Sequence, residues 1–341
     1  MEIKQLTETA ARILRPGMGI LAADESSSTI KKRFDAVGVE PTEENRRDYR
    51  ELLFRTAEAM RNHISGVILF EETLRQNARD GAPLVRLIEE AGSVPGIKVD
   101  RGTKPLALSP GETVTEGLDG LRERLQESYA LGARFAKWRA VIHIGDNIPT
   151  SAAISANAHA LARYAALCQE QNILPIVEPE VLMEGAHDIE RCAEVTELVL
   201  RTVYRELYEQ RVVLEGTILK PNMVVPGMAA PRQVGVEEVA EYTIRILKRS
   251  VPAAVPGIAF LSGGQSEEEA TAHLDAMSRM GGVPWRLTFS YGRALQASAQ
   301  SAWRGIPENV PAAQRAFAHR ARMNSLATLG QWSRASEAAA A

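Results

Sequence analysis

Short apolar runs alternate with amphipathic segments along most of the 341 residues. The runs are rich in Val, Ile, Leu and Phe, as buried parallel strands are. We predict eight strands, at residues 17–24, 66–71, 96–100, 135–139, 175–180, 217–220, 257–264 and 287–291. Helices are predicted at residues 1–15, 42–60, 82–92, 119–131, 151–171, 188–209, 236–250 and 266–279, with more helix after the last strand.

The spacing of these strands predicts the fold class. They recur every 30–45 residues or so with helices between them, which favours parallel β/α units. Eight such units indicate an α/β protein with a closed (β/α)₈ TIM barrel; a doubly wound open sheet is the alternative. Because the chain has no linker rich in Gly, Ser and Pro, we expect residues 1–341 to form one domain, with a flexible tail at 331–341.

Composition narrows the function classes. The net charge is −3 and the pI about 6.2, so no basic excess favours nucleic acid or an anionic membrane. The two cysteines, Cys168 and Cys192, are too few for a disulfide framework. Without a signal-peptide pattern or an apolar run of roughly 20 residues, the chain is expected to be a cytoplasmic enzyme or binding protein.

Charged residues gather near the C-terminal ends of the predicted strands, which is where TIM barrels carry their active sites. They are Asp24, Glu71, Lys98, Asp100, Lys137, Arg139, Glu178, Glu180 and Lys220. Several are spaced by two, so each such pair projects from one face of its strand. Buried charges are costly unless paired. One pair could be a structural salt bridge, but a whole ring facing the barrel interior favours a catalytic site.

Lys220 ends the sixth predicted strand, directly before Pro221. A lysine there could simply begin a surface loop. Together with Lys98 and Lys137, however, it would place three ammonium groups close together, and we expect their repulsion to lower at least one lysine pKa. A neutral amine attacks carbonyls and forms Schiff bases. Glu178 and Glu180 could carry the protons that such chemistry needs.

The last two predicted strands end in small residues. Ser262-Gly263-Gly264 follows the seventh, and Ser290-Tyr291-Gly292-Arg293 closes the eighth; each precedes a predicted helix. The loops after strands seven and eight of TIM barrels commonly hold phosphate at a helix N-terminus, although a glycine turn alone could be a plain helix entry. A phosphorylated carbonyl substrate is therefore expected. The six histidines show no metal-binding spacing, and each is interpreted as a surface or core residue.

Several long motifs resemble class I fructose-1,6-bisphosphate aldolases, and the resemblance extends from Gly19 to Ala327. The motifs are Gly19-Ile20-Leu21-Ala22-Ala23-Asp24-Glu25-Ser26, Thr42-Glu43-Glu44-Asn45-Arg46-Arg47, Gly96-Ile97-Lys98-Val99-Asp100, Phe135-Ala136-Lys137-Trp138-Arg139, Ile176-Val177-Glu178-Pro179-Glu180, Leu219-Lys220-Pro221-Asn222-Met223 and Phe289-Ser290-Tyr291-Gly292-Arg293. The resemblance implies a TIM-barrel lyase of glycolysis and gluconeogenesis. It would cleave fructose 1,6-bisphosphate reversibly to dihydroxyacetone phosphate and glyceraldehyde 3-phosphate, as a cytoplasmic homotetramer without a metal or another cofactor.

The resemblance also implies residue roles. Lys220 would form the Schiff base, and Glu180 would be the acid and base for carbinolamine formation, with Glu178 and Lys137 tuning protonation. Asp24 would take the proton of the C4 hydroxyl. One phosphate would be held by Ser262, Gly263, Gly264, Gly292 and Arg293, and the other with the help of Arg33 and Lys137. Lys98, Arg139 and Ser290 are further expected substrate or phosphate contacts.

The chain departs from the family pattern in three places. Glu71 stands where many relatives have histidine, Ser27-Ser28-Thr29 replaces a loop that usually contains glycine, and no tyrosine closes the C-terminus. A different proton donor, or slower turnover, is expected where animal relatives use that tyrosine. Three alternatives stay open: an aldolase preferring sedoheptulose 1,7-bisphosphate or fructose 1-phosphate, a metal-dependent aldolase, and a phosphosugar-binding scaffold without catalysis.

Overall fold

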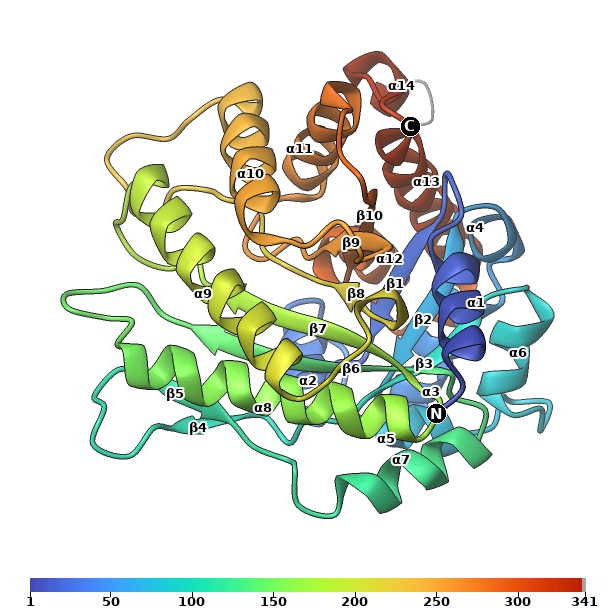
Figure 1. Ribbon diagram of the computed structural model, residues 1–341. Helices are drawn as coiled ribbons and strands as arrows, with labels where there is room; N and C mark the ends of the chain where they lie inside the picture. The colour runs from blue at the N-terminus through green and yellow to red at the C-terminus, as the bar shows by residue number, and fades with distance from the viewer. Residues whose placement is uncertain (339–341) are drawn as a thin grey trace.

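The computed structural model describes residues 1–338, and eight parallel strands form its centre (Figure 1). They close into a barrel in the order β1-β10-β9-β8-β7-β6-β3-β2. Their bounds are β1 Gly19–Ala23, β2 Ile64–Leu69, β3 Val94–Lys98, β6 Phe135–Ile142, β7 Leu174–Val181, β8 Ile218–Leu219, β9 Gly257–Phe260 and β10 Arg286–Tyr291. The (β/α)₈ TIM barrel is therefore confirmed, and the open sheet is excluded.

Helices surround the barrel (Figure 1). They are α1 Ile3–Ile13, α2 Ser27–Asp35, α3 Glu43–Phe54, α4 Ala57–Asn62, α5 Glu71–Arg75, α6 Leu84–Glu90, α7 Leu121–Ala130, α8 Ser151–Glu170, α9 Ile189–Glu209, α10 Val236–Ser250, α11 Glu267–Met280, α12 Arg293–Trp303, α13 Val310–Thr328 and α14 Arg334–Ala338, with 3₁₀ turns η1 Leu214–Gly216 and η2 Pro307–Asn309. The predicted capping box is present, because Ser266 and Glu269 exchange bonds with each other's backbone.

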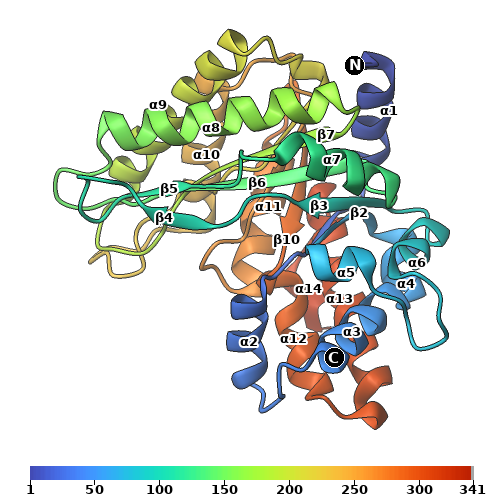
Figure 2. The same cartoon turned by 90° about the horizontal axis from the view of Figure 1, so that it is seen from below.

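Local backbone geometry explains where the sequence prediction differs. The single helix predicted at 42–60 is two helices, because Thr56 adopts a non-helical ψ of 81° between α3 and α4. Helix α2 was not predicted, nor was the hairpin of β4 (Thr103–Pro105) and β5 (Thr113–Thr115), which lies beside β6 (Figure 2). Its first strand is exposed throughout, so it lacks the alternation of a half-buried strand.

The barrel interior has an apolar layer below a charged one. The N-terminal helix α1 contributes Leu6, Ala10, Ile13 and Leu14 to an apolar cluster with inward-facing strand residues. Those strand residues are Ile20, Ala22, Ile68, Val94, Phe135, Leu174, Ile176, Ile218 and Ala259. Helix α1 therefore closes the N-terminal end, and the C-terminal ends of the strands are left for chemistry.

The described part of the C-terminal tail contacts the barrel helices. Glu337 on α14 accepts hydrogen bonds from Arg320 at 2.6 and 2.7 Å and from the Trp332 indole at 2.9 Å. Residues 339–341 lie outside the described residues, and the flexibility expected at 331–341 stays a prediction. Among residues 1–338 we find no helix of the length and apolarity needed to span a bilayer.

Candidate active site

One cleft of about 810 Å³ opens at the C-terminal ends of the barrel strands. Its lining includes all the residues to which the family resemblance gave a role: Asp24, Arg33, Lys98, Lys137, Arg139, Glu178, Glu180, Lys220, Ser262, Gly263, Gly264, Ser290, Gly292 and Arg293. They come from seven of the eight strands or from the segments that follow them. Of the predicted ring of strand-end charges, all but Glu71 and Asp100 thus share a single cavity.

Strand periodicity explains why charges point into this cleft. Phe135 and Ile176 belong to the apolar cluster inside the barrel. Side chains two residues further along a strand project from the same face. Lys137 follows Phe135 by two, and Glu178 follows Ile176 by two, so each lies one layer above the apolar interior. Lys220 follows the interior residue Ile218 in the same way.

A chain of ion pairs occupies the floor of the cleft. Glu178 bridges two lysines, with its Oε1 3.0 Å from Lys220 Nζ and its Oε2 3.2 Å from Lys137 Nζ. Lys137 Nζ also lies 2.7 Å from Asp24 Oδ2. The Glu178 and Lys220 side chains are 4% and 5% exposed. Within residues 1–338, Glu178 Oε2 has no polar partner besides this ion pair with Lys137, so the carboxylate lies between the two amines.

At Lys137 the neighbouring carboxylates outweigh the repulsion that was expected among the three lysines. Burial alone would lower the pKa of Lys137, but Asp24 and Glu178 outweigh it and raise that pKa above its usual value. Burial likewise opposes ionisation of Asp24, yet Lys137, Lys220 and Lys98 hold the Asp24 pKa well below its ordinary range. At neutral pH, therefore, Lys137 is protonated and Asp24 is ionised in the free protein.

The two glutamates of β7 have different partners. Glu178 contacts Lys220, whereas Glu180 is paired with Arg139 Nε. The Arg139 pKa is raised, because Glu180 outweighs the effect of burial. The family resemblance gave Glu180 the proton transfer at Lys220. The geometry instead favours Glu178, since its carboxylate is the one in contact with the Lys220 amine.

The opposite side of the cleft is built from backbone and small residues. Gly263 has a φ of +55°, a left-handed conformation that glycine adopts without strain. Gly292 is the N-cap residue of α12, so the free amides of that helix start at the cleft. Arg293 Nη2 donates to the Gly263 carbonyl at 2.9 Å and joins the two turns. Helix N-termini and an arginine together suit phosphate.

A buried histidine supports this side, although the sequence gave it no role. His273 on α11 lies 2.5 Å from Gln265 Oε1 through Nδ1, and Gln265 Nε2 donates to the Ser262 carbonyl at 3.0 Å. Because an amide oxygen only accepts, Nδ1 must carry the proton. Burial lowers the His273 pKa to about 4, against the opposing effect of Glu269. The sequence offered one signal for this contact: His273 lies in a predicted helix, eight residues after Gln265.

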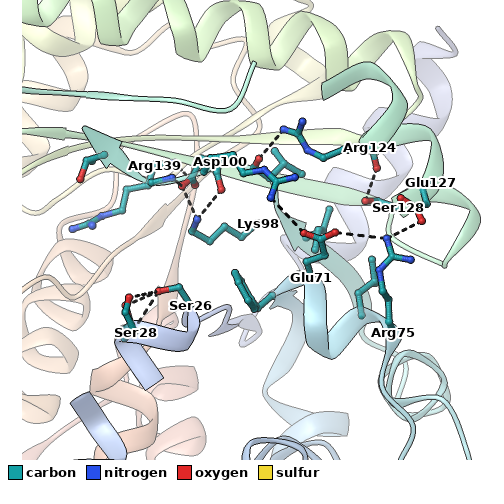
Figure 3. Close-up of a pocket in the computed structure, with 18 of the residues that line it drawn as sticks. Ser26, Ser28, Glu71, Arg75, Lys98, Asp100, Arg124, Glu127, Ser128 and Arg139 are labelled. Carbon is teal, nitrogen blue, oxygen red and sulfur yellow. Dashed lines mark hydrogen bonds and ion pairs between the residues drawn. The ribbon is translucent and has the colours of Figure 1, made fainter. Parts of the chain in front are cut away.

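Arg33 and Lys98 both line the cleft but contact different residues. Arg33 is paired with the buried Glu25, and its Nη2 is 3.3 Å from where a Cβ on Gly292 would stand. Arg33 therefore belongs to the glycine side. Lys98 Nζ is 2.6 Å from Asp100 Oδ1, and Lys98 also borders a second pocket of about 470 Å³ (Figure 3).

Glu71 lies in that second pocket and not in the barrel interior, where its place after a strand had put it. Strand β2 stops at Leu69, and Glu71 begins α5 instead. Its carboxylate is half exposed and lies 3.7 Å from Arg75 and 3.9 Å from Arg101 (Figure 3). Within residues 1–338 no group of three or more His, Cys, Asp or Glu side chains is arranged to hold a metal ion.

The chain is similar to known proteins over nearly its full length. The family model of class I fructose-bisphosphate aldolases matches residues 5–341. A probable fructose-bisphosphate aldolase class 1 of Xanthomonas campestris is 59% identical over 97% of this chain and 99% of its own. The cytosolic fructose-bisphosphate aldolase 4 of Arabidopsis thaliana is 58% identical over 96% of this chain and 83% of its own.

A solved structure agrees with this similarity. It is a fructose-bisphosphate aldolase from Plasmodium falciparum, crystallised with TRAP and a small-molecule inhibitor. The sequences are 50% identical, the match covers 97% of this chain and 96% of that one, and the TM-score is 0.95. Sequence and fold therefore point to the same family.

Proposed function

This chain belongs to the class I fructose-bisphosphate aldolase family, a family of Schiff-base lyases, and we propose that Lys220 is the nucleophile, with Glu178 as its proton carrier. The reaction is the reversible cleavage of fructose 1,6-bisphosphate to two triose phosphates, a step of glycolysis. One observation carries the assignment of roles: Glu178 bridges Lys220 and Lys137 on the floor of the cleft. A carboxylate between two amines can take a proton from one while the other stays charged.

The first steps need an amine and a proton carrier in contact. Lys220 Nζ must lose a proton before it attacks the ketose C2 carbonyl. The resulting carbinolamine then loses water when its hydroxyl is protonated, which leaves an iminium. Glu178 is suited to both transfers, since Oε1 lies 3.0 Å from Lys220 Nζ. Glu180 is occupied by Arg139, and we propose that it positions Arg139 toward substrate.

Bond cleavage needs a base for the C4 hydroxyl. We assign this role to Asp24, whose low pKa keeps it ionised at neutral pH. As the C3–C4 bond breaks, its electron pair passes to the iminium and forms an enamine, and the aldehyde leaves. Lys137 stays protonated beside Asp24 and Glu178, and its charge favours the anionic forms that appear during this step.

Two sets of donors are available for the two phosphates. One comprises Ser262, Gly263, Gly264, Ser290, Gly292 and Arg293, with Arg33 alongside. Lys98 and Arg139 form the other, next to Ser26 and Thr29 at the N-terminus of α2. This differs from the pairing of Arg33 with Lys137 that the resemblance suggested. Arg33 lies against Gly292, and Lys137 is held by two carboxylates.

Borohydride trapping tests the nucleophile. The protein is incubated with dihydroxyacetone phosphate, reduced, digested and mapped by mass spectrometry. We expect one reduced adduct, on Lys220. Lys220→Met should give no adduct and reduce cleavage by roughly 10⁵-fold, the scale seen when an enzyme loses its nucleophile. An adduct on Lys98 or Lys137, or turnover that survives in Lys220→Met, would overturn the assignment.

Assembly, location and domain organisation are proposals of the same kind. We propose a cytoplasmic homotetramer that binds neither nucleic acid nor membrane, in which residues 1–341 form one folding unit. Support for the location comes from relatives named cytosolic or cytoplasmic in plants. Analytical ultracentrifugation tests the tetramer, and a single calorimetric unfolding transition is expected of one folding unit.

A further inference from the structure

Two methionines cover the glycine turn that follows β9. Met183 follows β7 and Met228 follows β8, and β8 lies between β7 and β9 in the barrel (Figure 1). The Met228 amide donates to the Met183 carbonyl at 2.7 Å, so the two loops are tied together. The Gly264 amide donates to the thioether of Met183, with 2.9 Å between N and Sδ. Met228 Sδ lies 3.3 Å from where a Cβ on Gly264 would stand.

Both methionine side chains border the substrate cleft. Met183 and Met228 line the cleft, and Met228 is 62% exposed. A thioether sulfur is a weak hydrogen-bond acceptor, so phosphate can displace it from the Gly264 amide at little cost. A sulfoxide oxygen is polar and a much better acceptor, and methionine reaches that state by oxidation with peroxides.

We propose that Met183 and Met228 are a modification site through which peroxides weaken phosphate binding. In the reaction a thioether sulfur attacks one oxygen of a hydroperoxide, the O–O bond breaks, and water or an alcohol leaves. The sulfur is oxidised by two electrons and the peroxide is reduced. The sulfoxide oxygen then competes with substrate phosphate for the Gly264 amide. This inference rests on the proposed function, because it requires phosphate to bind at Gly264.

The location of the pair predicts a specific kinetic signature. The ion pairs around Lys220 involve no methionine, so the chemical step should be retained at saturating substrate. Losing one hydrogen bond to a charged phosphate should raise KM for fructose 1,6-bisphosphate about tenfold. The cysteines are poor competing targets, because burial raises the pKa of both Cys168 and Cys192 and disfavours their thiolates.

The test treats the enzyme with hydrogen peroxide, maps sulfoxides by mass spectrometry and measures kcat and KM. The variants are Met183→Leu, Met228→Leu and the double variant, which roughly conserve side-chain volume. Met280→Leu is the matched control, because Met280 is 47% exposed at the end of α11 and does not line the cleft. Thermal melts verify that each variant folds. If the double variant does not fold, the comparison is made with the two single variants.

We expect KM to rise with little change in kcat in the wild type and in Met280→Leu. The rise should be absent in the double variant and reversed by methionine sulfoxide reductases. An unchanged KM when both residues are oxidised would overturn the proposal, as would a rise that persists in the double variant. Failure of the proposed function would look different, because untreated enzyme would then give no Lys220 adduct or would bind phosphate independently of Arg293.

Discussion

The two sides of the cleft use opposite means to bind one substrate. The charged side, comprising Asp24, Lys137, Glu178 and Lys220, consists of buried side chains in contact with one another. The glycine side, comprising residues 262–264 and 292–293, consists of backbone turns and helix starts. Charges on the first side hold and move protons, whereas amides on the second bind a charge that the substrate brings. Changes on the charged side should therefore mainly lower kcat, and changes on the glycine side should mainly raise KM.

After Lys220, the largest effect on kcat is expected from Glu178 on the charged side, and it is compared with that of its neighbour Glu180. Glu178→Gln should lower kcat by about 10²- to 10⁴-fold, the usual contribution of a general acid or base. Glu180→Gln is the matched control on the same strand face, and its effect should be smaller because Glu180 contacts Arg139 and not Lys220. Steady-state kinetics and thermal melts are the measurements. A larger loss of kcat in Glu180→Gln would restore the role that the family resemblance gave to Glu180.

Arg293 tests the glycine side. Arg293→Ala removes a guanidinium that holds the Gly263 carbonyl and faces the cleft. A charge-assisted hydrogen bond contributes about 1.5–3 kcal/mol, so KM should rise about 10- to 100-fold while kcat changes less. Arg249→Ala is the control, because Arg249 pairs with Glu197 outside the cleft. A fall in kcat with an unchanged KM would contradict the division between the two sides.

Periodicity was sufficient to predict the charged side of the cleft. A spacing of two residues put Lys137 and Glu178 on the inner face of the barrel, and Lys220 was expected there because it ends a strand. The structure has all three there. Periodicity could not say which glutamate meets Lys220. Glu178 and Glu180 share a face and differ only in height along β7, and height depends on the register between neighbouring strands.

Features that depend on tertiary packing could not be predicted from the sequence, for a different reason. The polar hairpin β4–β5 shows no alternation, and Glu71 left the interior because β2 ended two residues earlier than the apolar pattern suggested. Gln265 and His273 meet only because the loop after β9 folds back onto α11. Such contacts depend on tertiary packing, which leaves no periodic pattern in a single sequence.

The smallest expected effect on KM comes from His273, which contacts Gln265 behind the glycine side. His273→Leu removes the donor to Gln265 and should raise KM about three- to tenfold, the effect of one lost hydrogen bond. His273→Asn keeps an N–H donor and should restore much of that loss. Steady-state kinetics separate KM from kcat. If both variants behave alike, the histidine contributes only packing.

The loss of folding stability at acid pH is an independent test of the contact between His273 and Gln265. Burial lowers the His273 pKa from 6.5 to about 4 in the folded state, so the unfolded chain binds more protons between these values. The stabilisation is therefore present above pH 6.5 and lost as the pH falls toward 4, by up to about 3 kcal/mol. Because Asn does not titrate, His273→Asn should lose less stability than the wild type when urea unfolding is compared at pH 7 and pH 4.5. Parallel losses in the two proteins would mean that His273 titrates normally, and the neutral donor to Gln265 would then have to be abandoned.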